Sequence, residues 1–140
     1  MYLSGGHKTV KNILKRGAFT VSMGDAEHAA AWDYVGIKSG NSVPDKVRAG
    51  FHVTKSEHVD APVIDELPLA LECKLVSYGE ETRLLTGEIV NVSVDERALD
   101  ENGKLAVEKL HVITFDYANH GYYVLGEKVA SAFEDGKKFK

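Results

Sequence analysis

Cysteine is nearly absent from this sequence: Cys73 is the single one among 140 residues. A disulfide within the chain and a cysteine-rich metal site are therefore excluded, and the composition suits a reducing cytoplasm. Long apolar runs are missing as well, because no stretch reaches the roughly 18 residues that a membrane helix needs. Neither sign of charge is in large excess, because 17 Lys and Arg nearly balance 21 Asp and Glu and the net charge is only −4. Composition thus gives no electrostatic case for nucleic acid or an anionic membrane as a partner.

What is present is typical of one globular domain. The hydrophobic fraction of 44% is ordinary for such a domain, and 140 residues are enough to bury a core. Nothing repeats internally and no linker divides the chain. We therefore predict one domain over residues 1–140.

The hydrophobic pattern predicts a mainly β fold with short helices. Glycine at position 17 is expected to end the first helix, and Asp25 is expected to cap the second. Strands joined by tight turns, with short helices among them, favour a small barrel-like β domain. The predicted helices cover residues 8–16, 26–34 and 43–49; the predicted strands cover residues 18–23, 69–78, 82–94, 112–115 and 122–125; residues 51–68 are expected to be irregular.

One segment has the residue types of an anion site. Gly5 and Gly6 precede the predicted first helix, and His7, Lys8 and Thr9 add donors at its start. A helix N-terminus offers free N–H groups and a partial positive charge, and glycines let a ligand approach the backbone closely. Together these features would hold a phosphate. The alternative is a glycine turn followed by a solvated lysine.

Other candidates are weaker. Lys46 is a further cation able to neutralise an anion, although a lone lysine on a short helix is usually just exposed. Aromatic residues near the predicted end of the sheet would wall a flat ligand, or fill a core or an interface; they are Phe115, Tyr117, Tyr122 and Tyr123. The six histidines have no metal-ligand spacing. Cys73 alternates with leucines and is expected to be an inert core thiol.

Several ordered stretches together resemble the flavin reductase-like family of FMN-binding split-barrel proteins. No single stretch is a catalytic signature, but the set follows one order along nearly the whole chain. The stretches are Gly6-His7-Lys8-Thr9 with Asn12-Ile13, residues 18–23, residues 33–40, Asp45-Lys46, residues 49–62, residues 66–75, residues 86–90 and residues 122–126.

The resemblance implies a split β-barrel that forms a homodimer, with FMN near the subunit interface. It implies an oxidoreductase that passes electrons from NAD(P)H or another donor through the bound flavin. By the same resemblance, His7, Lys8 and Thr9 would hold the FMN phosphate, Lys46 would reach the cofactor, and Tyr122 or Tyr123 would contact the isoalloxazine. No catalytic side chain and no metal site are expected, because the flavin carries the chemistry.

Two departures from the family pattern keep alternatives open. The resemblance starts partway through the domain, so roughly fifty residues, or several strands, of the family pattern have no counterpart here. The loop before residues 84–85 is also shorter than usual, with Thr82-Arg83 where many relatives carry a histidine. A non-catalytic flavin-binding or oligomeric remnant of this fold is the first alternative. A relative of the pyridoxal phosphate oxidases, which share a similar barrel, is the second, although the Gly-His-Lys-Thr segment and the Ser-Gly and Asp-Lys pairs favour the flavin reductase-like family over it.

Overall fold

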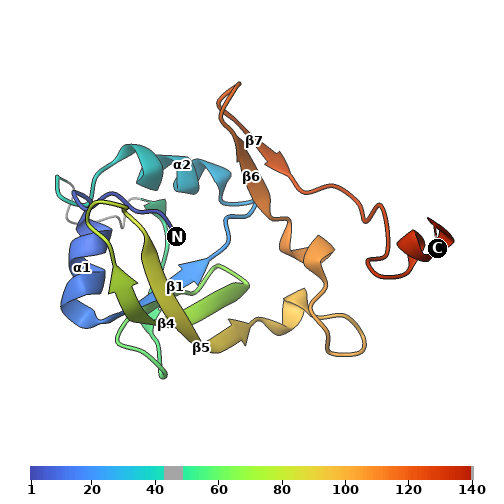
Figure 1. Ribbon diagram of the computed structural model, residues 1–140, viewed down its shortest axis with the longest axis horizontal. Helices are drawn as coiled ribbons and strands as arrows, with labels where there is room; N and C mark the ends of the chain where they lie inside the picture. Colours follow the sequence, from blue (N-terminus) through green and yellow to red (C-terminus); the bar gives the residue numbers. More distant parts are fainter. Residues whose placement is uncertain (43–48, 140) are drawn as a thin grey trace.

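The computed structural model describes residues 1–42 and 49–139 of the chain (Figure 1). Strands outnumber helices, and the helices are short, so the predicted mainly β class is confirmed. In chain order the elements are α1 (Lys8–Arg16), β1 (Ala18–Ser22), α2 (Ala29–Ile37), β2 (Val53–Lys55), β3 (Pro62–Ile64), β4 (Leu69–Tyr78), β5 (Leu85–Val94), the 3₁₀ turns η2 (Glu96–Ala98) and η3 (Val107–Leu110), β6 (Ile113–Asp116), β7 (Gly121–Val124) and η4 (Asp135–Phe139).

Helix α1 forms as its sequence predicts. Val10 and Ile13, three residues apart, form its buried stripe, and Lys15 and Arg16 in the last turn suit the negative end of the helix dipole. Gly17 ends the helix in the left-handed conformation, at φ 67°, and its N–H bonds the carbonyl of Ile13 at 2.8 Å. Glycine adopts this conformation without a Cβ clash, which is why the helix ends there.

The core lies on a three-stranded antiparallel sheet in the order β1-β4-β5. Phe19 of β1 pairs with Cys73 of β4, and both pack against Ile13 of α1 and Leu85 of β5. A side chain at Gly87 would collide with the ring of Phe19, so the two residues share one space. Burial raises the pKa of the Cys73 thiol, as expected for an inert core cysteine.

The opposite face of β4 carries a buried carboxylate. Glu72 is 1% exposed and accepts hydrogen bonds from Ser56, Asn91 and Ser93. The Ser56 hydroxyl oxygen in turn accepts from the N–H groups of His58 and Val59, both at 2.9 Å. Burial alone would raise the pKa of Glu72, but these hydrogen bonds outweigh it and lower the pKa below its ordinary value. The network fastens residues 56–59 to the sheet.

Strand β5 is the outer strand of this sheet, and much of it is open. Ile89 and Val92 are 54% and 49% exposed, although apolar residues of a strand beside the core are usually covered. Residues at the start of the chain cover its first part, because Tyr2 forms an antiparallel bridge with Leu84. The N–H of Leu3 donates to the carbonyl of Arg83, and the N–H of Leu85 donates to the carbonyl of Met1.

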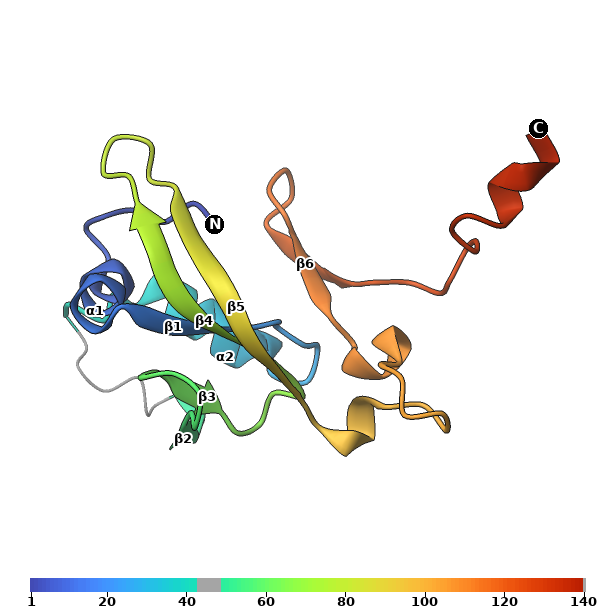
Figure 2. The ribbon, with the colours of Figure 1, turned by 60° about the horizontal axis from the view of Figure 1, so that its bottom comes forward.

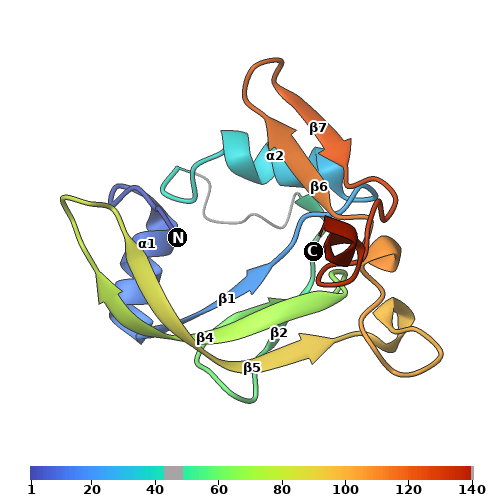
Figure 3. The same ribbon diagram turned by 45° about the vertical axis from the view of Figure 1, so that its right-hand side comes forward.

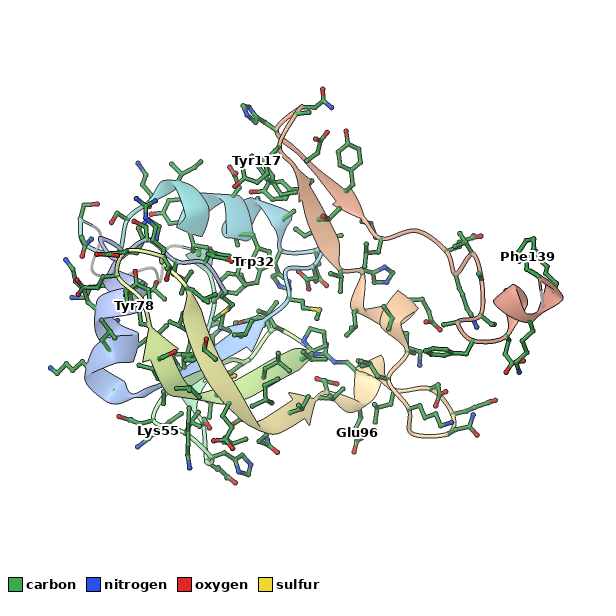
Figure 4. The ribbon with its side chains drawn as sticks, in the orientation of Figure 1. Trp32, Lys55, Tyr78, Glu96, Tyr117 and Phe139 are labelled. Carbon is green, nitrogen blue, oxygen red and sulfur yellow. The ribbon has the colours of Figure 1, made fainter. Side chains whose placement is uncertain are left out.

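Helix α2 and the β6–β7 hairpin lie outside the three-stranded sheet. In Figures 1, 2 and 3, α2 lies between α1 and the β6–β7 hairpin, and the chain beyond β7 extends away from the rest. Trp32 of α2 packs on Phe51, with ring centroids 5.3 Å apart, and lies between α2 and the sheet in Figure 4. Within the described residues, no helix has the length and apolar character needed to cross a membrane.

Two predicted boundaries and one predicted irregular segment were wrong for identifiable reasons. Asp25 does not cap a helix at residue 26; its carboxylate bonds the N–H and the ring of His28, and α2 begins only at Ala29. β5 begins at Leu85 instead of residue 82, because residues 79–84 form a wider turn in which Arg83 has φ 57°. β2 and β3 pair within the segment expected to be irregular. The predicted third helix lies almost wholly outside the described residues, and so does Lys46.

Candidate functional site

At the start of α1, the backbone N–H groups of the first turn receive no capping hydrogen bond from the N-cap side chain. His7 occupies the N-cap position and makes no side-chain capping hydrogen bond. Its own N–H is taken by the carbonyl of Ser4 at 3.0 Å, whereas the N–H groups of the first helical turn point out of the helix end. His7, Lys8 and Thr9 are all exposed. The structure therefore brings these three predicted residues together at a positively polarised helix end.

A second segment holds this helix end in place. The loop after α2 reaches back to it, and the Asn41 side-chain amide donates a 2.9 Å hydrogen bond to the carbonyl of Gly6. The Ser39 hydroxyl accepts from the N–H of Asn41 at 3.2 Å and so braces the loop. A Cβ built on Gly6 would meet nothing within 4 Å, so the backbone there is open to a ligand. An uncapped helix start with open space over its glycine fits a phosphate group.

A hollow of about 300 Å³ lies beside this helix start. Gly5, Val10 and Leu14 line it from the α1 side, and Tyr78 and Glu80 line it from the end of β4. The Tyr78 hydroxyl donates to the carbonyl of Leu3 at 2.9 Å, which ties the residues before the helix to the sheet. The lining is mixed, because Val10 and Leu14 are apolar whereas Glu80 and the hydroxyl of Tyr78 are polar.

The predicted aromatic residues form a cluster on the β6–β7 hairpin. Phe115 is its centre: the rings of Tyr117 and Tyr122 lie 5.0 Å and 5.3 Å from it, and the His120 ring lies 6.3 Å away and nearly parallel. The Tyr122 hydroxyl donates a 3.2 Å hydrogen bond to Asp33 of α2. Partial desolvation, together with the neighbouring Asp33 carboxylate, raises the pKa of Tyr122 above its usual range.

The two tyrosines named from the sequence do not share a surface. Tyr122 pairs with Phe115 and Tyr123 pairs with Thr114, so alternation along β7 puts their side chains on opposite faces of the hairpin. In Figures 1 and 3, α2 separates the hairpin from the start of α1. The start of α1 and Tyr122 are thus both linked to the α2 region, the first by Asn41 in the loop after α2 and the second by Asp33.

A second hollow, of about 350 Å³, lies on another side of the molecule. It has a mixed charged lining that includes Asp25, Glu66, Arg97, Lys109 and His111. Asp25 is 8% exposed and is satisfied by His28, with 2.9 Å between the His28 Nδ1 and the carboxylate. Among the described residues, none of those predicted as cofactor ligands lies in this hollow.

Comparison with known proteins identifies the family. The model of the flavin reductase-like domain matches residues 2–126. The chain belongs to the flavin reductase-like family. An uncharacterized protein of Aquifex aeolicus (strain VF5) is 32% identical over 107 residues, which are 75% of this chain and 55% of that protein. This flavin reductase-like chain therefore spans about half the length of that curated relative.

Two solved structures share the fold closely. The flavoredoxin of Desulfovibrio vulgaris (Miyazaki F) is 38% identical at a TM-score of 0.89, over 96% of this chain and 73% of that one. The flavoredoxin from Methanosarcina acetivorans is 26% identical at a TM-score of 0.86, over 99% of this chain and 74% of that one. The split-barrel fold expected for this flavin reductase-like chain is thereby confirmed.

Two residues of the candidate site were missed in the sequence. Asn41 and Asp33 each act on a partner far along the chain, at separations of 35 and 89 residues. Asn41 directly follows residues 33–40, one of the stretches that resemble the family, and this was the available signal for it. Asp33 begins the same stretch, residues 33–40, but its contact with Tyr122 depends on the fold, which brings the two residues together.

Proposed function

We propose that the chain binds FMN and passes electrons from NAD(P)H or another donor through it. Its membership of the flavin reductase-like family supports a flavin, and its similarity to flavoredoxins supports electron transfer. The observation that carries the assignment is the uncapped, exposed start of α1, where His7, Lys8 and Thr9 surround free backbone donors. FMN differs from riboflavin in having a terminal phosphate, and this is the group that such a helix end holds.

Each side chain has a defined task in this proposal. Lys8 supplies the compensating charge, and the hydroxyl of Thr9 and the ring of His7 supply further hydrogen bonds to phosphate oxygens. Asn41 keeps the glycine turn in place. Tyr122, held by Asp33, offers an aromatic edge for the isoalloxazine, while Lys46 is proposed as a further cofactor contact from the sequence alone. When bound, the flavin supplies the redox chemistry, and the protein's part is binding and orientation.

The decisive experiment compares FMN with riboflavin. The purified chain is mixed with an excess of either compound, freed of unbound material and examined by visible absorption. Retention of FMN with much weaker retention of riboflavin is expected, because the phosphate contacts are lost with riboflavin. Equal retention of both would refute the phosphate site, and retention of neither would refute flavin binding altogether.

A non-catalytic flavin-binding protein is the second candidate. It is favoured by the open strand β5, where Ile89 and Val92 are exposed. Anaerobic mixing of the FMN-loaded chain with NADH or NADPH separates the two candidates: bleaching of the flavin absorption supports electron transfer. Absence of bleaching with both donors and with dithionite-reduced carriers would leave binding alone. A cytoplasmic location stays a prediction from the composition.

A further inference from the structure

The second hollow, which we call the charged hollow, has the size and construction of a small-molecule site. Its volume of about 350 Å³ lies at the lower end of the roughly 300–1,000 Å³ that such sites have. Ala98 and Leu110 in its lining are only 2% and 5% exposed, so they form a buried apolar base, whereas most of the charged side chains around them are exposed. The lining consists of residues 25–27, 66, 68, 97–98 and 109–111.

Backbone hydrogen bonds join the segments that form this hollow. The N–H of Ala26 donates to the carbonyl of His111 at 3.0 Å. The N–H of Asp95, at the start of η2, donates to the carbonyl of Pro68 at 2.8 Å. The walls are therefore held in place before any ligand arrives, which lowers the ordering cost of binding.

The side of the hollow formed by η2 and η3 offers unused hydrogen-bond donors. The Asp95 carboxylate accepts from Nε and Nη2 of Arg97 at 3.0 and 2.8 Å, which fixes the guanidinium and leaves its Nη1 without a partner among the described residues. The ammonium of Lys109 donates to the carbonyl of Leu99 at 2.5 Å and keeps two further hydrogens. A fixed guanidinium edge beside an ammonium group is suited to a carboxylate.

The side formed by residues 25–27 offers an unused acceptor. Glu27 is exposed, and among the described residues its carboxylate accepts no hydrogen bond and forms no ion pair. It nevertheless lies close enough to attract Arg97: the hydrogen bond to Asp95 is the main cause that raises the pKa of Arg97, and the charge of Glu27 adds to it. Glu27 and Arg97 both line the hollow without touching, so a free carboxylate and a free guanidinium edge are separated by the space between them.

The lining as a whole has more carboxylates than cations. The Asp25 carboxylate is occupied by the ring of His28 at 2.9 Å, and the Glu66 carboxylate by the ring of His52 at 2.6 Å. These two acids do not need a ligand, but they add negative charge to that of Glu27. A ligand that carries only negative charge is therefore disfavoured in the charged hollow.

We propose that the charged hollow binds a free α-amino acid, with its ammonium on Glu27 and its carboxylate on Arg97 and Lys109. An α-amino acid carries both charges on one carbon atom, so it can satisfy both sides of the hollow at once. Its ammonium also has three donors for a carboxylate, which a quaternary ammonium lacks. The hollow shares no residue with the candidate flavin site, so this proposal stands or falls independently of FMN binding.

Calorimetric titration of the full chain with each proteinogenic amino acid tests the ligand class. At least one is expected to bind, and basic amino acids are expected to bind more tightly than acidic ones. The methyl ester of the tightest ligand lacks the carboxylate and its N-acetyl derivative lacks the ammonium. Each is expected to bind at least about tenfold more weakly, because a charge-assisted hydrogen bond is lost. No binding by any amino acid, or a derivative that binds as well as its parent, would overturn the proposal.

Variants test whether binding occurs in the charged hollow. Glu27→Gln and Arg97→Gln are each expected to weaken the Kd of the tightest amino acid about tenfold. The matched controls Glu96→Gln and Lys104→Gln change exposed side chains that do not line the hollow, and they are expected to leave the Kd unchanged. Circular dichroism checks that all four variants are folded. Equal affinity in Glu27→Gln and Glu96→Gln would place the ligand elsewhere and contradict the proposal.

Discussion

The side-chain amide of Asn41 donates a 2.9 Å hydrogen bond to the carbonyl of Gly6 and thereby fixes the turn that precedes α1. The two residues belong to different segments, one after α2 and one before α1. Their contact restrains the glycine turn before α1. The backbone N–H groups at the start of the helix still face outward. A ligand at this place meets a site that is already formed, which lowers the ordering cost of binding.

Replacement of Asn41 by alanine is therefore expected to weaken FMN binding about three- to tenfold, the size of one neutral hydrogen bond. Quenching of FMN fluorescence measures the affinity. The control is Ser42→Ala, because the Ser42 hydroxyl bonds only the nearby carbonyl of Ser39 among the described residues. An equal loss in both variants would mean that the loop as a whole, and not the contact with Gly6, is responsible.

Replacement of Lys8 by alanine is expected to weaken FMN binding about tenfold, since a charge-assisted hydrogen bond to phosphate is lost. Riboflavin binding should not change, because riboflavin has no phosphate. Lys11, exposed on the same helix beyond its first turn, provides the matched control Lys11→Ala. If Lys11→Ala weakens FMN binding as much as Lys8→Ala, general electrostatics and not a site explains the loss.

Tyrosine titration separates Tyr122 from the other tyrosines. The pKa of Tyr122 is raised, so its neutral hydroxyl holds Asp33 below about pH 10, and this stabilisation is lost as the pH rises through the raised pKa. Tyrosine ionisation is followed by ultraviolet absorption as the pH is raised. The ionisation step at the highest pH is expected to be absent in Tyr122→Phe and present in Tyr123→Phe. The same latest step in both variants would exclude Tyr122 as its source.

The buried carboxylate of Glu72 contributes to stability in a pH-dependent way. Its pKa is lowered in the folded state, so its contribution is complete above the unfolded value near 4.5 and is lost as the pH falls through the lower, folded value. Glu72→Gln is expected to cost about 2–3 kcal/mol at neutral pH, since an amide cannot accept all three hydrogen bonds as a carboxylate does. Urea unfolding at pH 7 and at acid pH measures both effects. Glu88→Gln, at an exposed position of β5, should change stability by less than about 0.5 kcal/mol.

Two glycines with opposite expected behaviour test the account of the helices. Gly17→Ala forces a Cβ into a left-handed residue and should cost about 1 kcal/mol. Gly36→Ala, inside α2 with nothing within 4 Å of the added carbon, should stabilise the protein by about 0.5–1 kcal/mol. Thermal unfolding measures both. A destabilised Gly36→Ala variant would show that α2 packs more tightly than described.

The sequence predicted those elements whose signals are local. α1 and β4 have the predicted bounds, because a glycine ends one and alternating leucines mark the other. β2 and β3 were missed because three-residue strands are too short to show a period. Glu72 looked like the polar side of a half-buried strand, yet both faces of β4 are buried there. Its three hydrogen-bond donors come from other parts of the chain, so no spacing in the sequence reveals the network.

The candidate site likewise contains residues that the sequence predicts and residues that only the fold reveals. The donors at the start of α1 are neighbours in sequence and could be named from it, whereas Asn41 and Asp33 depend on how α2 is placed. Which of Tyr122 and Tyr123 faces α2 also needed the fold, because alternation alone does not say which face of a hairpin meets a helix.

The shared space of Phe19 and Gly87 has a consequence for how this sequence can evolve. A side chain at position 87 is admitted only if the aromatic ring at position 19 becomes smaller, so neither position is free to drift alone. Homologues of this fold should therefore show paired substitutions at these two positions, with bulk moving from one strand to the other while the combined volume is conserved.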